Sequence, residues 1–226
     1  MKKRILWHGS PIVVERPNLA KGKAHNDYGR GFYCTENPEM AKEWACVMPS
    51  QNGYANRYEL NCTGLSVLNL SDDKFHVLNW LAILAMHRDF RTSTPVGIEG
   101  KEYLIREFAI DITSYDIIKG YRADDSYFAF ARAFVNNMIT VEQLAKAMKL
   151  GGLGEQIVLK SEKSFEHLHF LGKEYAEGAM YFAKRESRNR IAEQSFRKIM
   201  TGRDNKGLYM ADILREEIKN EDTRLR

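Results

Sequence analysis

The sequence has few of the features that mark secreted, disulfide-bonded or metal-binding proteins. It contains three cysteines among 226 residues, at positions 34, 46 and 62, and none of them has the close pair spacing of a metal site. An odd number of cysteines without such pairs is typical of reduced thiols in a cytoplasmic protein. We therefore expect neither disulfides nor a bound metal.

Long apolar runs are also missing. No stretch approaches the roughly 18 apolar residues that a membrane span requires. The N-terminal segment MKKRILWHGSP has an apolar run of three residues, which is too short for a signal peptide. These absences predict a cytoplasmic protein without a membrane partner.

A strong excess of one charge is absent as well. The net charge is +4, with 28% charged and 44% hydrophobic residues. This mildly basic balance is only weak evidence for a nucleic-acid partner. The hydrophobic content is ordinary for a folded chain, and the length permits one sizeable domain, alone or with a small appendage.

Local patterns predict an α+β fold. Asn37 followed by Pro38 is typical of a helix start, with Asn37 as the N-cap, and Thr140 is expected to cap a short helix. The segment after Ser71–Asp73 predicts a strongly apolar helix over 74–89. Alternation of apolar and polar residues and flanking turn residues predict strands at 4–10, 29–36, 54–60, 66–70, 116–121, 155–160 and 167–171.

The character of the chain changes near residue 175, where a long charged helical region begins. We therefore expect a core domain over 1–174 and a helical C-terminal extension over 175–226. Basic side chains in the extension suit a phosphate-bearing partner, but intervening glutamates fit a solvated helix better.

Three separated fragments carry residues suited to chemistry. The first, LWHGS (6–10), sets a histidine and a glycine at a strand end. The second, YGRGFY (28–33), has two glycines before an aromatic strand, and Trp44 follows eleven residues after Tyr33. The third, GEQIV (154–158), puts Glu155 at the start of an apolar strand, where it is expected to face a cleft. Taken alone, each fragment also fits an ordinary structural role.

Together, in this order, the fragments resemble the diphtheria-toxin-like branch of the ADP-ribosyltransferases, which includes the poly(ADP-ribose) polymerases. That branch has a His–Tyr–Glu triad on three strands, and here the triad would be His8, Tyr33 and Glu155. The resemblance is nearest to a bacterial family of ADP-ribosyltransferase-like proteins, some of which look like toxins of toxin–antitoxin pairs. It implies a core with a split mixed or antiparallel sheet, flanking helices and NAD+ as co-substrate.

The resemblance also implies a role for each residue. His8 would bond a ribose hydroxyl, and the Gly9 backbone would pair with the nicotinamide carboxamide. Tyr33 and Trp44 would stack on the nicotinamide ring. Glu155 would bond the ribose 2′-hydroxyl and stabilise the oxocarbenium-like charge that forms as the glycosidic bond breaks.

Further NAD+-contacting residues are implied with less support. Ser10 would reach a ribose or phosphate oxygen, and Gly31 would let the backbone approach the ligand. Arg30, Lys21 and Lys23 lie in a loop expected to overhang the diphosphate, although an ordinary charged surface loop explains the two lysines better. The polar and aromatic segment 120–128 fits equally a cleft wall or a helix start capped by its aspartates.

The implied activity is mono-ADP-ribosyl transfer from NAD+ to a protein or nucleic-acid acceptor, with a small antitoxin protein as a partner if the chain is a toxin. Two alternatives stay open. One is another enzyme on the same fold, either an RNA 2′-phosphotransferase or an NAD+ glycohydrolase. The other is a non-catalytic module that binds NAD or ADP-ribose.

Overall fold

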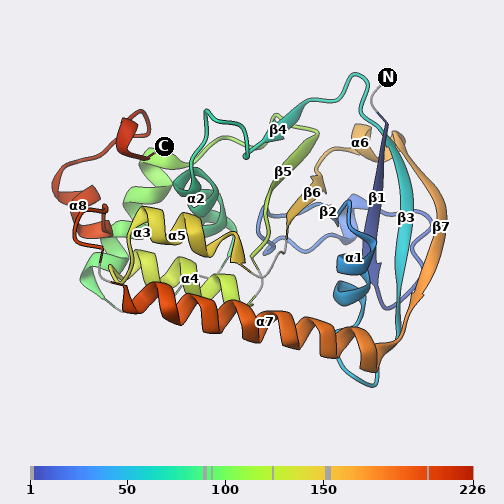
Figure 1. The fold of residues 1–226 in the computed structure, drawn as a ribbon. Coiled ribbons are helices and arrows are strands. Elements are labelled where there is room, and N and C mark those ends of the chain that lie inside the picture. Colours follow the sequence, from blue (N-terminus) through green and yellow to red (C-terminus); the bar gives the residue numbers. More distant parts are fainter. Residues whose placement is uncertain are drawn as a thin grey trace.

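The described residues form an α+β structure in which two β-sheets are flanked by helices (Figure 1). This class agrees with the sequence prediction. The computed structural model describes residues 3–88, 91–92, 94–123, 125–150, 154–202 and 204–225. None of the helices within these ranges combines the length and the apolarity needed to cross a membrane.

The first sheet has three antiparallel strands in the order β1–β3–β7. Its register pairs His8 with Asn56, so the predicted histidine lies beside the middle of β3. The strands are β1 (Lys3–Ser10), β3 (Gly53–Asn61) and β7 (Leu168–Ala176).

The second sheet has four strands in the order β2–β6–β5–β4 and is mixed, because β4 and β5 run parallel while the other pairs are antiparallel. In its register Tyr33 pairs with Val158. The strands are β2 (Phe32–Cys34), β6 (Glu155–Leu159), β5 (Ile117–Tyr121) and β4 (Val67–Asn69).

An isolated bridge between Trp7 and Thr35 joins the two sheets within the described residues. Two backbone hydrogen bonds form it, from Trp7 N to Thr35 O at 2.8 Å and from Thr35 N to Trp7 O at 2.9 Å. At the next residue of β1 the backbone pairing stops, and the His8 ring bonds the Tyr33 carbonyl instead. The two sheets therefore part at His8.

Helix α1 (Pro38–Ala45) begins as predicted, because the Asn37 side chain accepts hydrogen bonds from the Glu39 and Met40 amides. The helix packs on β1 and β3. A Cβ atom at Gly9 would lie 2.0 Å from the Ala41 carbonyl oxygen, so only glycine allows this approach.

The helices between residues 77 and 147 build a layer on the β4–β5 side of the structure around a large apolar core. Trp80, Phe130 and Phe134 are fully buried in it. Thr140 caps α5 as predicted, whereas the helix expected over 74–89 starts at Val77, with His76 at its N-cap. The helices of this layer are α2 (Val77–His87), α3 (Pro95–Phe108), α4 (Asp125–Val135) and α5 (Val141–Ala147).

The C-terminal region belongs to the same core. The expected domain boundary at residue 174 lies inside β7, and α7 runs from α1 across to α4 and α5 (Figure 1). Phe196 of α7 packs on Phe130 with ring centroids 4.1 Å apart, and Arg188 pairs with Glu43 of α1 at 2.9 Å. The shorter elements and this region are α6 (Glu162–Glu166), α7 (Gly178–Thr201), α8 (Met210–Arg215) and two 3₁₀ turns (Leu19–Lys21, Thr223–Leu225).

Asn56 of β3 holds the loop that follows β1. Its side chain is fully buried, its Nδ2 donates to the His8 and Ile12 carbonyls at 3.2 and 3.3 Å, and its Oδ1 accepts from the Val14 amide at 2.9 Å. Tyr58 adds a hydrogen bond to the Val14 carbonyl. The loop is therefore fixed beside the point where the sheets part.

We expect Asn56→Leu to lower the free energy of unfolding by about 2 kcal/mol, because a buried group that bonds several backbone atoms is lost. Urea denaturation measures the change. Asn61→Leu is the matched control at the end of the same strand, where the side chain accepts one hydrogen bond, from the Thr63 amide. Equal losses in the two variants would contradict the anchoring role of Asn56.

Candidate functional site

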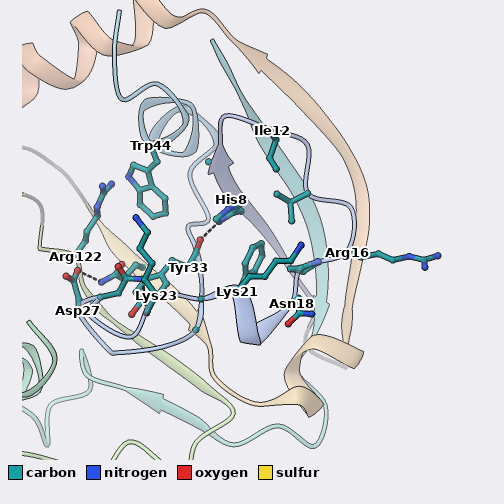
Figure 2. A pocket seen from close by; sticks show the side chains of 18 of the residues that line it. His8, Ile12, Arg16, Asn18, Lys21, Lys23, Asp27, Tyr33, Trp44 and Arg122 are labelled. Atoms are coloured by element: carbon teal, nitrogen blue, oxygen red, sulfur yellow. Dashed lines mark hydrogen bonds between the residues drawn. The ribbon is translucent and has the colours of Figure 1, made fainter. Parts of the chain in front are cut away.

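A cavity of about 700 Å³ lies where the two sheets part. This volume is in the range of small-molecule binding sites. Figure 2 shows His8, Tyr33 and Trp44 around it, with Asp27 and Arg122 together at one side. Two carboxylates and five cations line it; the cations are Arg16, Lys21, Lys23, Arg88 and Arg122. The excess of positive charge favours an anionic ligand.

His8 closes the gap between β1 and β2 with its side chain. Its Nδ1 lies 2.8 Å from the Tyr33 carbonyl oxygen, and its ring packs on Phe32 at 4.2 Å. Burial lowers the pKa of His8, and the hydrogen bond to Tyr33 opposes this only in part. The imidazole is therefore neutral at pH 7, and because Nδ1 must donate to the carbonyl, Nε2 is an acceptor.

The Tyr33 hydroxyl makes two hydrogen bonds, which hold the side chain in place. The hydroxyl donates to the Gly29 carbonyl at 2.6 Å and accepts from the Tyr28 amide at 3.0 Å. Burial raises the pKa of the Tyr33 phenol, so the group stays neutral. With its polar end occupied, Tyr33 offers the cavity an aromatic ring in a fixed position.

Gly31 lines the cavity next to Tyr33. A Cβ atom there would lie 2.5 Å from Val158 Cγ1 and 2.9 Å from the Leu159 carbonyl oxygen. No side chain fits in this contact between β2 and β6. Gly31 therefore allows packing against the neighbouring strand, and its expected role in a close approach to a ligand stays a prediction.

Trp44 reaches the cavity from α1, beside Gly9 of β1. Its indole Nε1 is buried and has no hydrogen-bond partner among the described residues. The Arg122 guanidinium lies over the indole ring, 4.2 Å from its centroid, as a cation–π contact. One face of the ring is thus occupied, and a ligand would have the other.

Glu155 does not face the cavity, which corrects the expectation from the sequence. Its carboxylate pairs with Lys119 Nζ at 2.5 Å and accepts a hydrogen bond from Ser71, and it is absent from the described cavity lining. Successive residues of a strand point to opposite faces, so Gln156 takes the position on the cavity side. Gln156 shares its face with Val158, the partner of Tyr33 in the register.

Of the remaining residues expected to contact a ligand, some line the cavity and some do not. Lys21 and Lys23 do, whereas Ser10 and Arg30 are not among the described lining residues. The Ser10 hydroxyl instead accepts from the Ile12 amide at 3.3 Å.

Segment 120–128 supplies Arg122 and Ala123 to the cavity wall. Asp124 of the same segment lies outside the described residues.

Asp27, Arg88 and Gln156 are among the lining residues that the sequence patterns do not single out. Asp27 is a buried carboxylate, 5% exposed, whose Oδ1 lies 3.6 Å from the Arg88 guanidinium. In the sequence it stands in a polar loop that resembles ordinary surface. Gln156 directly follows Glu155, and the sequence favours the glutamate because a carboxylate suits the expected chemistry better than an amide.

No group of three or more His, Cys, Asp or Glu side chains within the described ranges could hold a metal ion. The chemistry available in the cavity comes from aromatic rings, cations, one neutral histidine, three side-chain amides and two carboxylates; the amides and carboxylates are Asn18, Asn26, Gln156, Glu15 and Asp27.

Residues 4–170, which include every described residue of the cavity wall, match a family described as protein of unknown function, DUF3990. No curated protein and no solved structure matches the chain. Because the match covers well over half of the chain, the protein belongs to the DUF3990 family.

Proposed function

We propose that this protein binds NAD+ in the cavity and transfers its ADP-ribose to a protein or nucleic-acid acceptor. The observation that carries the proposal is the meeting of His8, Gly9 and Tyr33, from two different strands, at the edge of one cavity with Trp44 beside them. If the resemblance to ADP-ribosyltransferases holds, these residues must lie close together in space. Their spacing along the chain does not by itself bring them together. The split between the two sheets fits the core that this resemblance implies.

The charges of the cavity suit the diphosphate of NAD+. Lys21 and Lys23 belong to the loop over the cavity, and both of their ammonium groups are available to phosphate oxygens (Figure 2). Arg16 points away from the other labelled side chains in the same view. We assign the diphosphate to the two lysines.

The polar atoms near the parting of the sheets suit the sugar and the base. His8 Nε2 is an acceptor for a ribose hydroxyl, and the Gly9 backbone is open to a carboxamide in the cavity. The Tyr33 ring and one face of Trp44 suit a flat nicotinamide ring. The orphaned Trp44 Nε1 would gain an acceptor from the ligand or its water.

The reaction breaks the bond between the ribose C1′ and the nicotinamide nitrogen, whose electron pair leaves with neutral nicotinamide. The acceptor nucleophile then bonds to C1′ and releases its proton to solvent. In the transition state the ribose carries positive charge, as in other glycosyl transfers. The resemblance expects a carboxylate at Glu155, and the cavity residue next to it is Gln156. Its carbonyl oxygen can accept a hydrogen bond from the 2′-hydroxyl.

A non-catalytic NAD or ADP-ribose-binding protein is the second candidate. The observation in its favour is that Glu155 faces away from the cavity and that an amide, which cannot act as a base, takes the cavity position. Release of nicotinamide separates the two candidates, because only the transferase produces it.

We expect purified protein to release nicotinamide from NAD+ when cell lysate supplies acceptors, and Gln156→Leu to reduce the rate about a hundredfold, as for loss of one preorganised polar group. Chromatographic measurement of nicotinamide tests this. Glu155→Gln is the matched comparison, and we expect it to keep most of the activity because its carboxylate binds Lys119 instead. A hundredfold loss in Glu155→Gln with an active Gln156→Leu would reverse the two roles.

We expect replacement of both Lys21 and Lys23 by alanine to weaken NAD+ binding about tenfold, because two charge-assisted contacts to phosphate are lost. Isothermal titration calorimetry measures the affinity. Nicotinamide riboside, which has no phosphate, is the matched ligand, and its affinity should not change. A parallel loss for both ligands would remove the lysines from the diphosphate site.

A further inference from the structure

Asp27 is a buried carboxylate with its hydrogen bonds already made. It lies in the wall of the cavity, and its Oδ2 accepts from the Ala123 amide and from Gln156 Nε2, both at 2.9 Å. Its Oδ1 faces Arg88 at 3.6 Å. Burial raises the pKa of Asp27, while the two hydrogen bonds and the charges of Arg88 and Arg122 act in the opposite direction.

Such a residue is costly for stability, because burial of a carboxylate is unfavourable unless partners compensate it. The fold supplies those partners from three separate places, the Ala123 backbone, the Arg88 side chain after α2 and Gln156 of β6. A buried ion held this way at a cavity wall indicates a functional constraint.

Two acceptors fix the Gln156 amide. Its Nε2 donates to Asp27 Oδ2 and, at 3.1 Å, to the Tyr121 carbonyl. That carbonyl is itself fixed, since it also accepts from the Tyr28 hydroxyl at 2.8 Å and from the Trp80 indole at 3.0 Å. Neither acceptor can donate, so rotation of the amide by half a turn would bring Oε1 against two oxygens.

The orientation of the amide is therefore set by its surroundings, which directs Oε1 away from Asp27 and Tyr121. Gln156 lines the cavity and is 3% exposed, and its side-chain hydrogen bonds to the described residues all use Nε2. We therefore infer that Oε1 is the amide atom turned toward the cavity. Asp27 itself is poorly suited to act on a ligand, since Oδ2 already accepts two hydrogen bonds and Oδ1 faces a guanidinium.

We propose that Asp27 is a positioning residue that holds the Gln156 amide with its carbonyl oxygen toward the ribose of bound NAD+. The inference rests on the proposed function and extends it, because it names the pair that replaces a catalytic carboxylate. Asp27 acts through Gln156 and does not touch the reacting atoms.

The test is a double-mutant cycle on nicotinamide release, with kcat and KM for NAD+ measured for each full-length variant. We expect Asp27→Leu and Gln156→Leu each to lower kcat about a hundredfold, with less than threefold change in KM, because the affected contact forms mainly in the transition state. The double variant should lose no more than either single one, since the two residues act as a unit.

Asp27→Asn is the conservative variant. One asparagine oxygen can still accept from both Ala123 and Gln156, so we expect kcat within about fivefold of the wild type. Thermal melting and NAD+ titration of every variant show whether it is folded and binds the substrate.

Additive losses in the double variant, or an Asp27→Asn variant as impaired as Asp27→Leu, would overturn the positioning role. If Asp27→Leu does not fold, the comparison of Asp27→Asn with Gln156→Leu still tests the positioning role. A kcat of Asp27→Asn as low as that of Gln156→Leu would contradict it. A wild type that binds NAD+ without releasing nicotinamide would overturn the proposed function, and the inference with it. The two failures can be told apart by the wild type. If the wild type releases nicotinamide, only the positioning role of Asp27 can fail; if it does not, the proposed function fails as well.

Discussion

The parting of β1 and β2 immediately after the Trp7–Thr35 bridge is the constraint on which the site depends. Two backbone hydrogen bonds hold the strands together at the bridge, and one residue later a side chain replaces the backbone as the link. A continued ladder would fill the space with paired strands. Because His8 bonds the Tyr33 carbonyl through its ring, the strands stay connected while a cavity opens between them.

The neighbouring elements keep this opening from closing. Gly9 lets α1 approach β1 and brings Trp44 to the cavity, while Gly31 lets β2 pack on β6. Helix α7 connects α1 to the helical layer through an ion pair to Glu43 that is largely shielded from solvent. The C-terminal region, expected to be an extension, therefore contributes to the rigidity of the cavity wall.

The sequence predicted what local chemistry determines. Asn37–Pro38 and Thr140 mark helix starts through hydrogen bonds to amides within a few residues, and these predictions are confirmed. The sequence does not indicate that α7 packs on the core, because its contacts, such as Phe196 on Phe130, join distant parts of the chain. Its charged surface gave no local sign of them.

The face of β6 could not be predicted for a related reason. The apolar residues after Glu155 are buried on both sides of the strand, so their pattern does not say which of two adjacent residues meets the cavity. A shift of one residue exchanges the two faces. Chemistry alone favours the glutamate, whereas the register with β2 places Gln156 on the side of Tyr33. Nothing in the sequence near Asp27 indicates that it is buried at a cavity, since its partners come from positions about 60 to 130 residues away.

Under the proposed function, an amide in place of a carboxylate changes how negative charge would act on the ribose. A carboxylate presents its full charge directly, whereas the Gln156 carbonyl presents a dipole. Donation from Nε2 to the charged Asp27 polarises the amide and increases the negative charge on Oε1, because hydrogen bonds in a chain strengthen one another in a low-dielectric interior. Part of the effect of the buried Asp27 charge would thus act at the cavity wall, while Arg88 stabilises the ion itself. If the cavity binds NAD+ as proposed, the pair would favour a cationic ribose without a carboxylate placed against it, in a cavity whose charges are mainly positive.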